Sequence, residues 1–305
     1  MAKVIDQQTA DQWALYQCDC VEGIGDLGDG TIHYSMFSPP FASLYTYSAS
    51  DRDMGNCQNY DEFSQHFSYL IAELHRVTMP GRLCSVHCMN LPATMTHDGY
   101  IGLKDFRGDI IRSFTDAGFI YHSEVAIWKD PVTQMQRTKS LGLLHKQLCK
   151  DSTRSRMALP DYVCTFRKPG DNPEPVEGEL DRWVGDKSTF KQTGRLSIDI
   201  WQRYASPIWS DINQSNTLQF TTARDGRDER HICPLQLEVI ERCVQLWSNP
   251  GDTVLDPFSG IGSTGHVAVK SGRRFVGFEL KESYFKVARR NMRAAEKSTQ
   301  EQRLF

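Results

Sequence analysis

Short strand-like runs alternate with helical patterns along most of this 305-residue chain. The strand-like runs are rich in β-branched, aromatic and cysteine residues, which favour extended structure. Strands that alternate with helices form an open sheet covered by helices on both faces. The sequence therefore predicts an α/β fold with an open, doubly wound, mostly parallel seven-stranded sheet. The seven strands are expected at Trp13–Cys18, Ile32–Phe37, Arg82–Cys88, Phe119–Trp128, Tyr162–Arg167, Thr253–Asp256 and Arg274–Glu279.

Three segments carry the apolar period of amphipathic helices. Tyr60–Met79 places its apolar side chains on one stripe, and Pro80 and Gly81 are expected to end this helix. Pro234–Ser248 repeats the period, and Ser283–Lys297 predicts a charged C-terminal helix.

Composition excludes several classes of protein. With 39% hydrophobic and 24% charged residues, the chain is globular rather than disordered. No run approaches the ~20 apolar residues of a membrane span, so no membrane association is expected. The nine cysteines form no Cys-x-x-Cys pair, and their odd number favours a reducing cytoplasm. The segment CSVHC at residues 84–88 has no second cluster of ligands to complete a metal site, so no metal is expected.

One long segment, residues 169–230, breaks the alternation of strands and helices. It is rich in Pro, Gly, Asp and Asn, and its large aromatic residues follow no period. We predict that this segment is an insert that serves recognition. The alternative is a structural loop whose aromatic residues pack onto the sheet. These residues are Trp183, Trp201, Tyr204 and Trp209.

A glycine-rich loop follows the strand at Thr253–Asp256 and opens a helix. It reads DPFSGIGSTG over residues 256–265, and Gly260, Gly262 and Gly265 match the pattern of dinucleotide-binding loops. No Lys follows the last glycine, so the loop is not a P-loop. The next strand ends at Glu279, whose carboxylate can hold both ribose hydroxyls of an adenosine. Nicotinamide dinucleotides and S-adenosylmethionine both fit these features.

A rigid turn of Ser38, Pro39, Pro40 and Phe41 ends the strand at Ile32–Phe37. Its prolines cannot continue a central strand because they donate no hydrogen bond to the ladder. The turn lies where open α/β sheets bind ligands, beyond the carboxyl ends of the strands. It offers a hydroxyl, a prolyl carbonyl and an aromatic face. These groups suit an exocyclic amine, because two of them accept its N–H groups and the ring stacks on its base.

The turn, the glycine loop and Glu279 together resemble the amino-group DNA methyltransferases, which make N4-methylcytosine or N6-methyladenine with S-adenosylmethionine. The catalytic turn comes first and the cofactor loop last, an order that resembles the permuted β class of this family. The resemblance covers about Leu15–Cys88 and His231–Met292, and more loosely Phe119–Arg167. It implies a Rossmann-like methyltransferase fold, double-stranded DNA as partner, and the cytoplasm of a bacterium or of a phage-infected host.

The resemblance divides the chain into a catalytic part (1–168), a target-recognition insert (169–230) and a cofactor-binding part (231–305). It assigns catalysis to Ser38, Pro39, Pro40 and Phe41, which match the motif Asp/Ser/Asn-Pro-Pro-aromatic. His231 stands in the place of a His/Pro segment of the family but lacks Pro directly after it. A helix that starts near Pro234 explains this segment equally well. The residues expected to bind the cofactor are Asp19, Asp256, Phe258, Gly260, Gly262, Ser263 and Glu279.

The implied mechanism is direct methyl transfer to a base flipped out of the duplex. Phe41 would stack on this base, and Ser38 and the Pro39 carbonyl would accept the hydrogens of its amine. Methylation at cytosine C5 needs a Cys nucleophile, which that family carries in a Pro-Cys pair, and the chain contains no such pair. Ser at the first motif position favours N4 of cytosine over N6 of adenine, where Asp is commoner.

Basic residues gather in one segment although the net charge is −3. From Lys129 to Arg156, seven Lys or Arg residues stand against two Asp residues. Phosphate contacts supply much of the affinity for DNA, so this segment predicts a DNA contact, with a solvated basic face as the alternative. A second basic run, Lys270–Lys297, is interpreted as a solvated helix face. The residues expected to contact DNA are Lys139, Lys146, Arg154 and Arg156.

Two other functions remain open at this point. A nicotinamide-dependent oxidoreductase would use the glycine loop but would leave the turn at Ser38 without a role. Gly265 precedes Glu279 by 14 positions, fewer than the ~20 usual in nicotinamide sites. A catalytically silent DNA-binding module would keep the fold, but the intact turn argues against it. The sequence leaves open whether the chain is a monomer or a homodimer.

Overall fold

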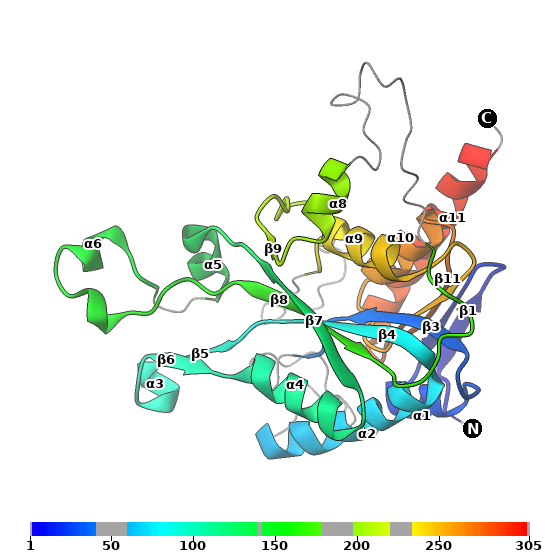
Figure 1. The fold of residues 1–305 in the computed structure, drawn as a ribbon, viewed down its shortest axis with the longest axis horizontal. Coiled ribbons are helices and arrows are strands. Elements are labelled where there is room, and N and C mark those ends of the chain that lie inside the picture. Colours follow the sequence, from blue (N-terminus) through cyan, green and yellow to red (C-terminus); the bar gives the residue numbers. More distant parts are fainter. Residues whose placement is uncertain (1, 41–59, 139–141, 178–197, 220–233, 304–305) are drawn as a thin grey trace.

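The computed structural model describes residues 2–40, 60–138, 142–177, 198–219 and 234–303 (Figure 1). Within these residues a mixed nine-stranded sheet runs in the order β1-β2-β11-β10-β3-β4-β8-β7-β9, and β5 and β6 form a separate pair. The strands are β1 (Asp6–Thr9), β2 (Trp13–Gln17), β3 (Ile32–Phe37), β4 (Thr78–Cys88), β5 (Leu91–Ala93), β6 (Gly102–Lys104), β7 (Ile120–Ile127), β8 (Asp161–Arg167), β9 (Ile208–Trp209), β10 (Thr253–Asp256) and β11 (Arg274–Phe278).

The predicted α/β class with a mostly parallel sheet is confirmed. All seven predicted strands form, and five of the eight pairings in the described sheet are parallel. Two further strands extend the sheet beyond the predicted seven. The strand β1 pairs with β2 at one edge, and β9 pairs with β7 at the other.

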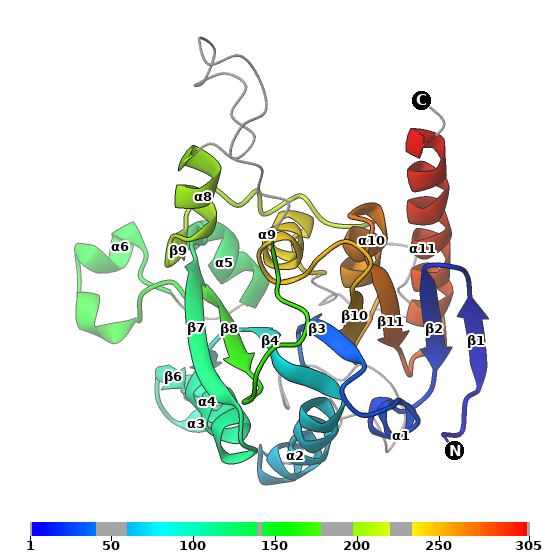
Figure 2. The same ribbon diagram turned by 45° about the vertical axis from the view of Figure 1, so that its right-hand side comes forward.

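Helices cover both faces of the sheet, as Figure 2 shows. The predicted helices correspond to α2, α9 and α11, but Pro80 and Gly81 do not end α2. That helix already ends at Val77, and both residues lie inside β4, where Gly81 has a φ of +74°. The helices are α1 (Cys20–Gly25), α2 (Tyr60–Val77), α3 (Met95–Asp98), α4 (Phe106–Asp116), α5 (Pro131–Thr138), α6 (His145–Leu148), α8 (Ile198–Tyr204), α9 (Leu237–Trp247), α10 (Ser263–Lys270) and α11 (Glu282–Arg303).

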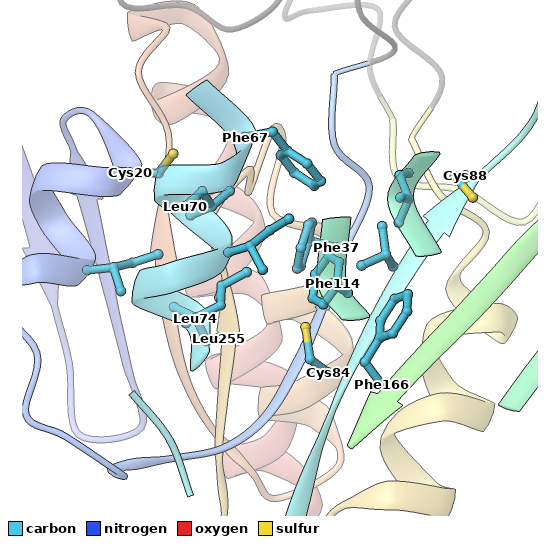
Figure 3. Close-up of a cluster of buried hydrophobic side chains, with 14 of the residues drawn as sticks. Cys20, Phe37, Phe67, Leu70, Leu74, Cys84, Cys88, Phe114, Phe166 and Leu255 are labelled. Atoms are coloured by element: carbon cyan, nitrogen blue, oxygen red, sulfur yellow. The ribbon is translucent and has the colours of Figure 1, made fainter. Parts of the chain in front are cut away.

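A hydrophobic core lies on each face of the sheet. The core between the sheet and α1, α2 and α4 contains the apolar stripe of α2, and Figure 3 shows the Phe67 ring of this stripe pointing toward Phe37 of β3. The core under α9, α10 and α11 takes the alternate strand residues, such as Met36. Neighbouring residues of β3 therefore enter opposite cores, as the two-residue period of a strand requires.

The direction of the strands in the sheet determines where a ligand can bind. The strands β2, β11, β10, β3 and β4 are parallel neighbours, so their carboxyl ends meet at one edge. The helices that follow β10 and β3 cover opposite faces, which makes the boundary between these two strands a topological switch point. Open α/β sheets bind ligands in the crevice at such a point.

The described part of segment 169–230 is tied to the sheet. The strand β9 lies in this segment, and its Trp209 is 1% exposed in the core, whereas Trp201 is 56% exposed. Trp183 lies outside the described residues. At the beginning of the central strand β3, His33 Nε2 lies 3.2 Å from Glu174 Oε2. Some aromatic residues of this segment thus pack onto the sheet, while its role in recognition stays a prediction.

No helix among the described residues is long and apolar enough to cross a membrane.

Candidate active site

The glycine loop connects β10 to α10 at the switch point. Gly260 and Gly262 have φ values of +53° and +86°, which favour glycine, and Gly262 caps the N-terminus of α10. Gly265 has a different role. A Cβ atom there would lie 2.6 Å from both Met292 Sδ of α11 and the ring of Phe275 in β11. The first two glycines therefore form the turn, and Gly265 lets α10 pack closely on its neighbours.

Glu279 follows β11 and lies against this loop. Its Oε2 accepts a hydrogen bond from the Gly260 N–H at 2.8 Å, and its Oε1 accepts one from the Lys281 N–H at 2.8 Å. On the next strand, Asp19 caps α1, where its Oδ1 accepts the N–H groups of Val21 and Glu22. The pairing of β11 with β2 brings these two carboxylates to adjacent strand ends.

Asp256, the last residue of β10, is a buried acid. Its Oδ1 accepts the Phe258 N–H at 2.9 Å, and burial raises the pKa of its carboxyl to about 7. A cationic group bound beside Asp256 would favour the ionised form. S-adenosylmethionine carries an ammonium group, a ribose diol and an adenine, and the three acids at adjacent strand ends fit these groups. Ser263, predicted to join this site, is buried in the first turn of α10.

The turn after β3 carries a hydrogen-bond chain that the sequence did not reveal. Ser38 Oγ lies 2.7 Å from Nδ1 of His87, which is on the neighbouring strand β4. His87 Nε2 lies 2.9 Å from Asp161 Oδ2, at the start of β8. Asp161 also pairs with Lys129, which follows β7. His87 and Asp161 are 7% and 2% exposed, so the chain leads from the half-buried Ser38 into the interior.

The charge of Asp161 decides which way these hydrogen bonds run. Burial alone would raise the pKa of Asp161, but Lys129 and His87 outweigh it and lower this pKa to about 2. An ionised carboxylate only accepts hydrogen bonds, so His87 Nε2 carries a hydrogen, and in the neutral imidazole Nδ1 is then an acceptor. With this tautomer Ser38 donates its O–H to His87, and its oxygen lone pairs point elsewhere as acceptors.

The structure describes two of the other three residues that were predicted to be catalytic. Pro39 is buried and Pro40 half-buried directly after Ser38. Phe41 lies outside the described residues, as do Lys139 and His231. The structure therefore brings Ser38, Asp256 and Glu279 to one edge of the sheet and adds His87 and Asp161 to them.

The predicted DNA-contacting residues lie in the connection between β7 and β8. Figure 1 shows α6 in a lobe that projects beyond these strands. Lys146 in α6 and Arg154 in the following 3-10 helix are exposed. Arg156 is half-buried and donates to the Met157 carbonyl at 2.9 Å. Lys129, counted with the basic segment from sequence, is instead paired with Asp161 and is only 12% exposed.

The switch-point loop, its carboxylates and the Ser-Pro-Pro turn define an enzyme that transfers a group from an adenosine-containing cofactor. Comparison with known proteins is more specific. The DNA methylase family of N6 and N4 methyltransferases matches residues 32–290. The type II methyltransferase M1.MboII of Moraxella bovis is 35% identical over 278 residues, which cover 88% of this chain and 92% of that protein. The chain belongs to this family and is an S-adenosylmethionine-dependent DNA methyltransferase.

Solved structures share the fold. The cytosine-N4-specific PvuII DNA methyltransferase superposes with a TM-score of 0.63 at 17% identity, and 95% of this chain and 90% of that one are covered. The Thermus thermophilus protein TTHA0409, in complex with S-adenosyl-L-methionine, gives a TM-score of 0.62 at 21% identity, with coverage of 91% and 93%. Family membership decides against the nicotinamide-dependent oxidoreductase and the silent DNA-binding module.

Proposed function

We propose that this enzyme methylates N4 of a cytosine flipped out of double-stranded DNA. One observation carries the proposal: Ser38 Oγ lies 2.7 Å from His87 Nδ1 at the switch point. Because the serine donates its only hydrogen to His87, its lone pairs accept an N–H group of the amine. The neighbouring Pro39 carbonyl would accept the second N–H group, so the lone pair of the amine nitrogen turns toward the cofactor.

The arrangement of the strands supports a direct transfer. Ser38 follows β3 and Asp256 ends β10, and these strands are parallel neighbours. The amine and the cofactor would therefore meet across one strand spacing, and positioning would supply most of the rate. S-adenosylmethionine supplies a methyl group activated by its sulfonium. Phe41 would stack on the flipped base and offset part of the cost of flipping.

The cofactor contacts belong to the same proposal. Glu279 would accept the ribose hydroxyls, and Asp19 would meet the adenine. Asp256 would pair with the ammonium group, because no cation pairs with this buried acid within the described residues. Phe258 lies 5.8 Å from Phe37 between ring centroids and would form an apolar wall between the cofactor and the turn.

We further propose that segment 169–230 reads the target sequence and that the α6 lobe holds the phosphates. The division into 1–168, 169–230 and 231–305 rests on this assignment. The seven described cysteines are free thiols, which fits work in the cytoplasm.

The decisive experiment is methyl transfer from labelled S-adenosylmethionine to plasmid DNA, followed by nucleoside mass spectrometry. We expect labelled N4-methylcytosine, and we expect Ser38→Ala to abolish at least about 99% of the product, in line with the loss of an oriented acceptor. Lys297→Ala, in the exposed part of α11, is the matched control and should leave the product unchanged. N6-methyladenine as the only product would overturn the choice of base and keep the reaction class.

A further inference from the structure

We propose that His87, held by Asp161 and Lys129, receives the proton that the target amine loses during methylation, with Ser38 as the relay between them. This inference rests on the proposed function, since it needs an amine at Ser38. Ser38 would touch the amine, whereas His87 would act through Ser38 as a positioning and proton-accepting residue.

The proposed reaction transfers one methyl group and one proton, and groups at the site can accept both. The amine nitrogen forms a bond to the methyl carbon while the carbon–sulfur bond breaks, and S-adenosylhomocysteine leaves. The methylated nitrogen then carries a positive charge and gives one proton to Ser38 Oγ. Ser38 passes its own hydroxyl proton to His87 Nδ1, so the serine stays neutral and His87 becomes an imidazolium. That proton returns to solvent after the product leaves.

The direction of each hydrogen bond suits this transfer. With Nε2–H held by Asp161, the neutral imidazole has its free lone pair on Nδ1, and Ser38 Oγ lies 2.7 Å from this atom as the donor. Asp161 holds the other ring nitrogen at 2.9 Å, so the imidazole keeps both its orientation and its tautomer. A serine alone would be a poor proton acceptor, and its contact with a neutral imidazole provides the missing base.

Lys129 balances the carboxylate that holds His87. A carboxylate with no cation beside it favours the charged form of a neighbouring imidazole, and an imidazolium cannot accept a proton. The Lys129 ammonium pairs with Asp161 and offsets its charge. Asp161 Oδ1 is buried and has no hydrogen-bond partner in the described part of the chain, whereas Oδ2 meets both His87 and Lys129.

The remaining charged groups around His87 belong to other pairs. On β7, Glu124 lies 2.8 Å from Arg107 of α4, and the thiols of Cys88 and Cys164 lie 4.0 Å apart between β4 and β8. The contact with Cys164 and burial raise the pKa of Cys88, so its thiol stays neutral. The charged pair that contacts His87 is therefore Asp161 with Lys129. A purely structural role would not need this arrangement, because apolar residues fill a buried site at lower cost.

Single-turnover kinetics across pH 5.5–9 test the relay. In the wild type the rate should fall at acid pH, because an imidazole that already carries a proton cannot accept another. His87→Gln keeps an acceptor for the Ser38 O–H but cannot take its proton. It should lose about 10²-fold in the single-turnover rate, the lower range for acid–base catalysis, and lose the acid limb, while S-adenosylmethionine binding by calorimetry stays within about threefold.

Two charge variants separate the relay from a structural role. Lys129→Met leaves Asp161 unopposed and should move the acid limb to higher pH. Asp161→Asn removes the negative charge and should move it to lower pH. Equal acid limbs in all variants, or a His87→Gln rate within about threefold of wild type, would overturn the relay. If the wild type methylates no amine, the proposed function fails; if it does and the limbs do not move, only the relay fails.

Discussion

Asp256 and Asp161 are both buried at the edge of the sheet where the cofactor and the base are expected, but they differ in charge. Asp161 has Lys129 as a partner, and its pKa falls to about 2. Asp256 has only hydrogen bonds to offset its burial, and its pKa rises to about 7. Asp161 is therefore ionised and can stabilise a positive charge that forms nearby, whereas Asp256 is only partly ionised near pH 7 and a bound cation would complete its ionisation.

At the residue scale, Asp256→Asn should stabilise the cofactor-free protein at high pH. The folded pKa of about 7 lies above the unfolded value of 3.8, so the contribution of Asp256 to stability is lost as pH rises between these values. The amide stays neutral, so the variant should exceed the wild type at pH 8 by at most about 4 kcal/mol, and match it near pH 4. Urea unfolding at both pH values measures this difference.

The same substitution should weaken S-adenosylmethionine binding, because the amide cannot form an ion pair with an ammonium group. In the wild type, affinity measured by calorimetry should fall as pH drops below about 7, where Asp256 takes up its proton. A variant that is less stable than the wild type at pH 8, or whose affinity keeps the same pH dependence, would contradict this account of Asp256.

At the element scale, the close packing of α10 on β11 and α11 should depend on Gly265. Gly265→Ala places a Cβ 2.6 Å from Met292 Sδ and from the Phe275 ring, so α10 must shift and carry the loop with it. We expect a loss of about 1–3 kcal/mol in the free energy of unfolding and about tenfold weaker S-adenosylmethionine binding. Denaturant titration and calorimetry measure the two effects.

Gly251→Ala is the matched control for this prediction. Gly251 has a φ of +85°, but a Cβ there would meet nothing within 4 Å. Its substitution should cost about 1–2 kcal/mol of stability through backbone strain and leave cofactor affinity unchanged. Equal cofactor affinity in both variants would show that the loop does not depend on the position of α10.

The elements that the sequence predicted are those with a local signal. The glycine loop, the Pro-Pro turn and the apolar stripe of α2 each lie within a short stretch of chain. The edge strands β1 and β9 have only four and two residues, too few to show a period. The contact between His87 and Asp161 joins residues 74 positions apart, and it depends on the antiparallel register of β4 and β8. Neither strand encodes that register by itself.

At the scale of the whole molecule, Lys146 and Arg154 are the exposed residues of the described chain that were predicted to contact DNA, and both lie in one lobe. The lobe with Lys146 and Arg154 projects beyond β7 and β8 (Figure 1). Lys297 lies on α11, which packs near β2 at the other side of the sheet. Lys129, which the sequence analysis grouped with the basic segment, instead pairs with Asp161 in the interior. A buried carboxylate without a cationic partner would destabilise the fold, whereas an exposed lysine contributes little to stability.

Because Lys146 and Arg154 lie in the lobe and Lys297 lies on α11, substitutions at the two places should change the salt dependence of DNA affinity differently. If Lys146 and Arg154 each neutralise one phosphate, then alanine at either position should reduce the slope of log affinity against log salt concentration by about 1. The double variant should reduce the slope by about 2, because each neutralised phosphate releases its own counterions. Fluorescence anisotropy with a labelled duplex from about 50 to 200 mM salt measures the slope. Lys297→Ala should leave it unchanged, and a slope that falls equally for Lys297→Ala would mean that DNA lies across α11 rather than along the lobe.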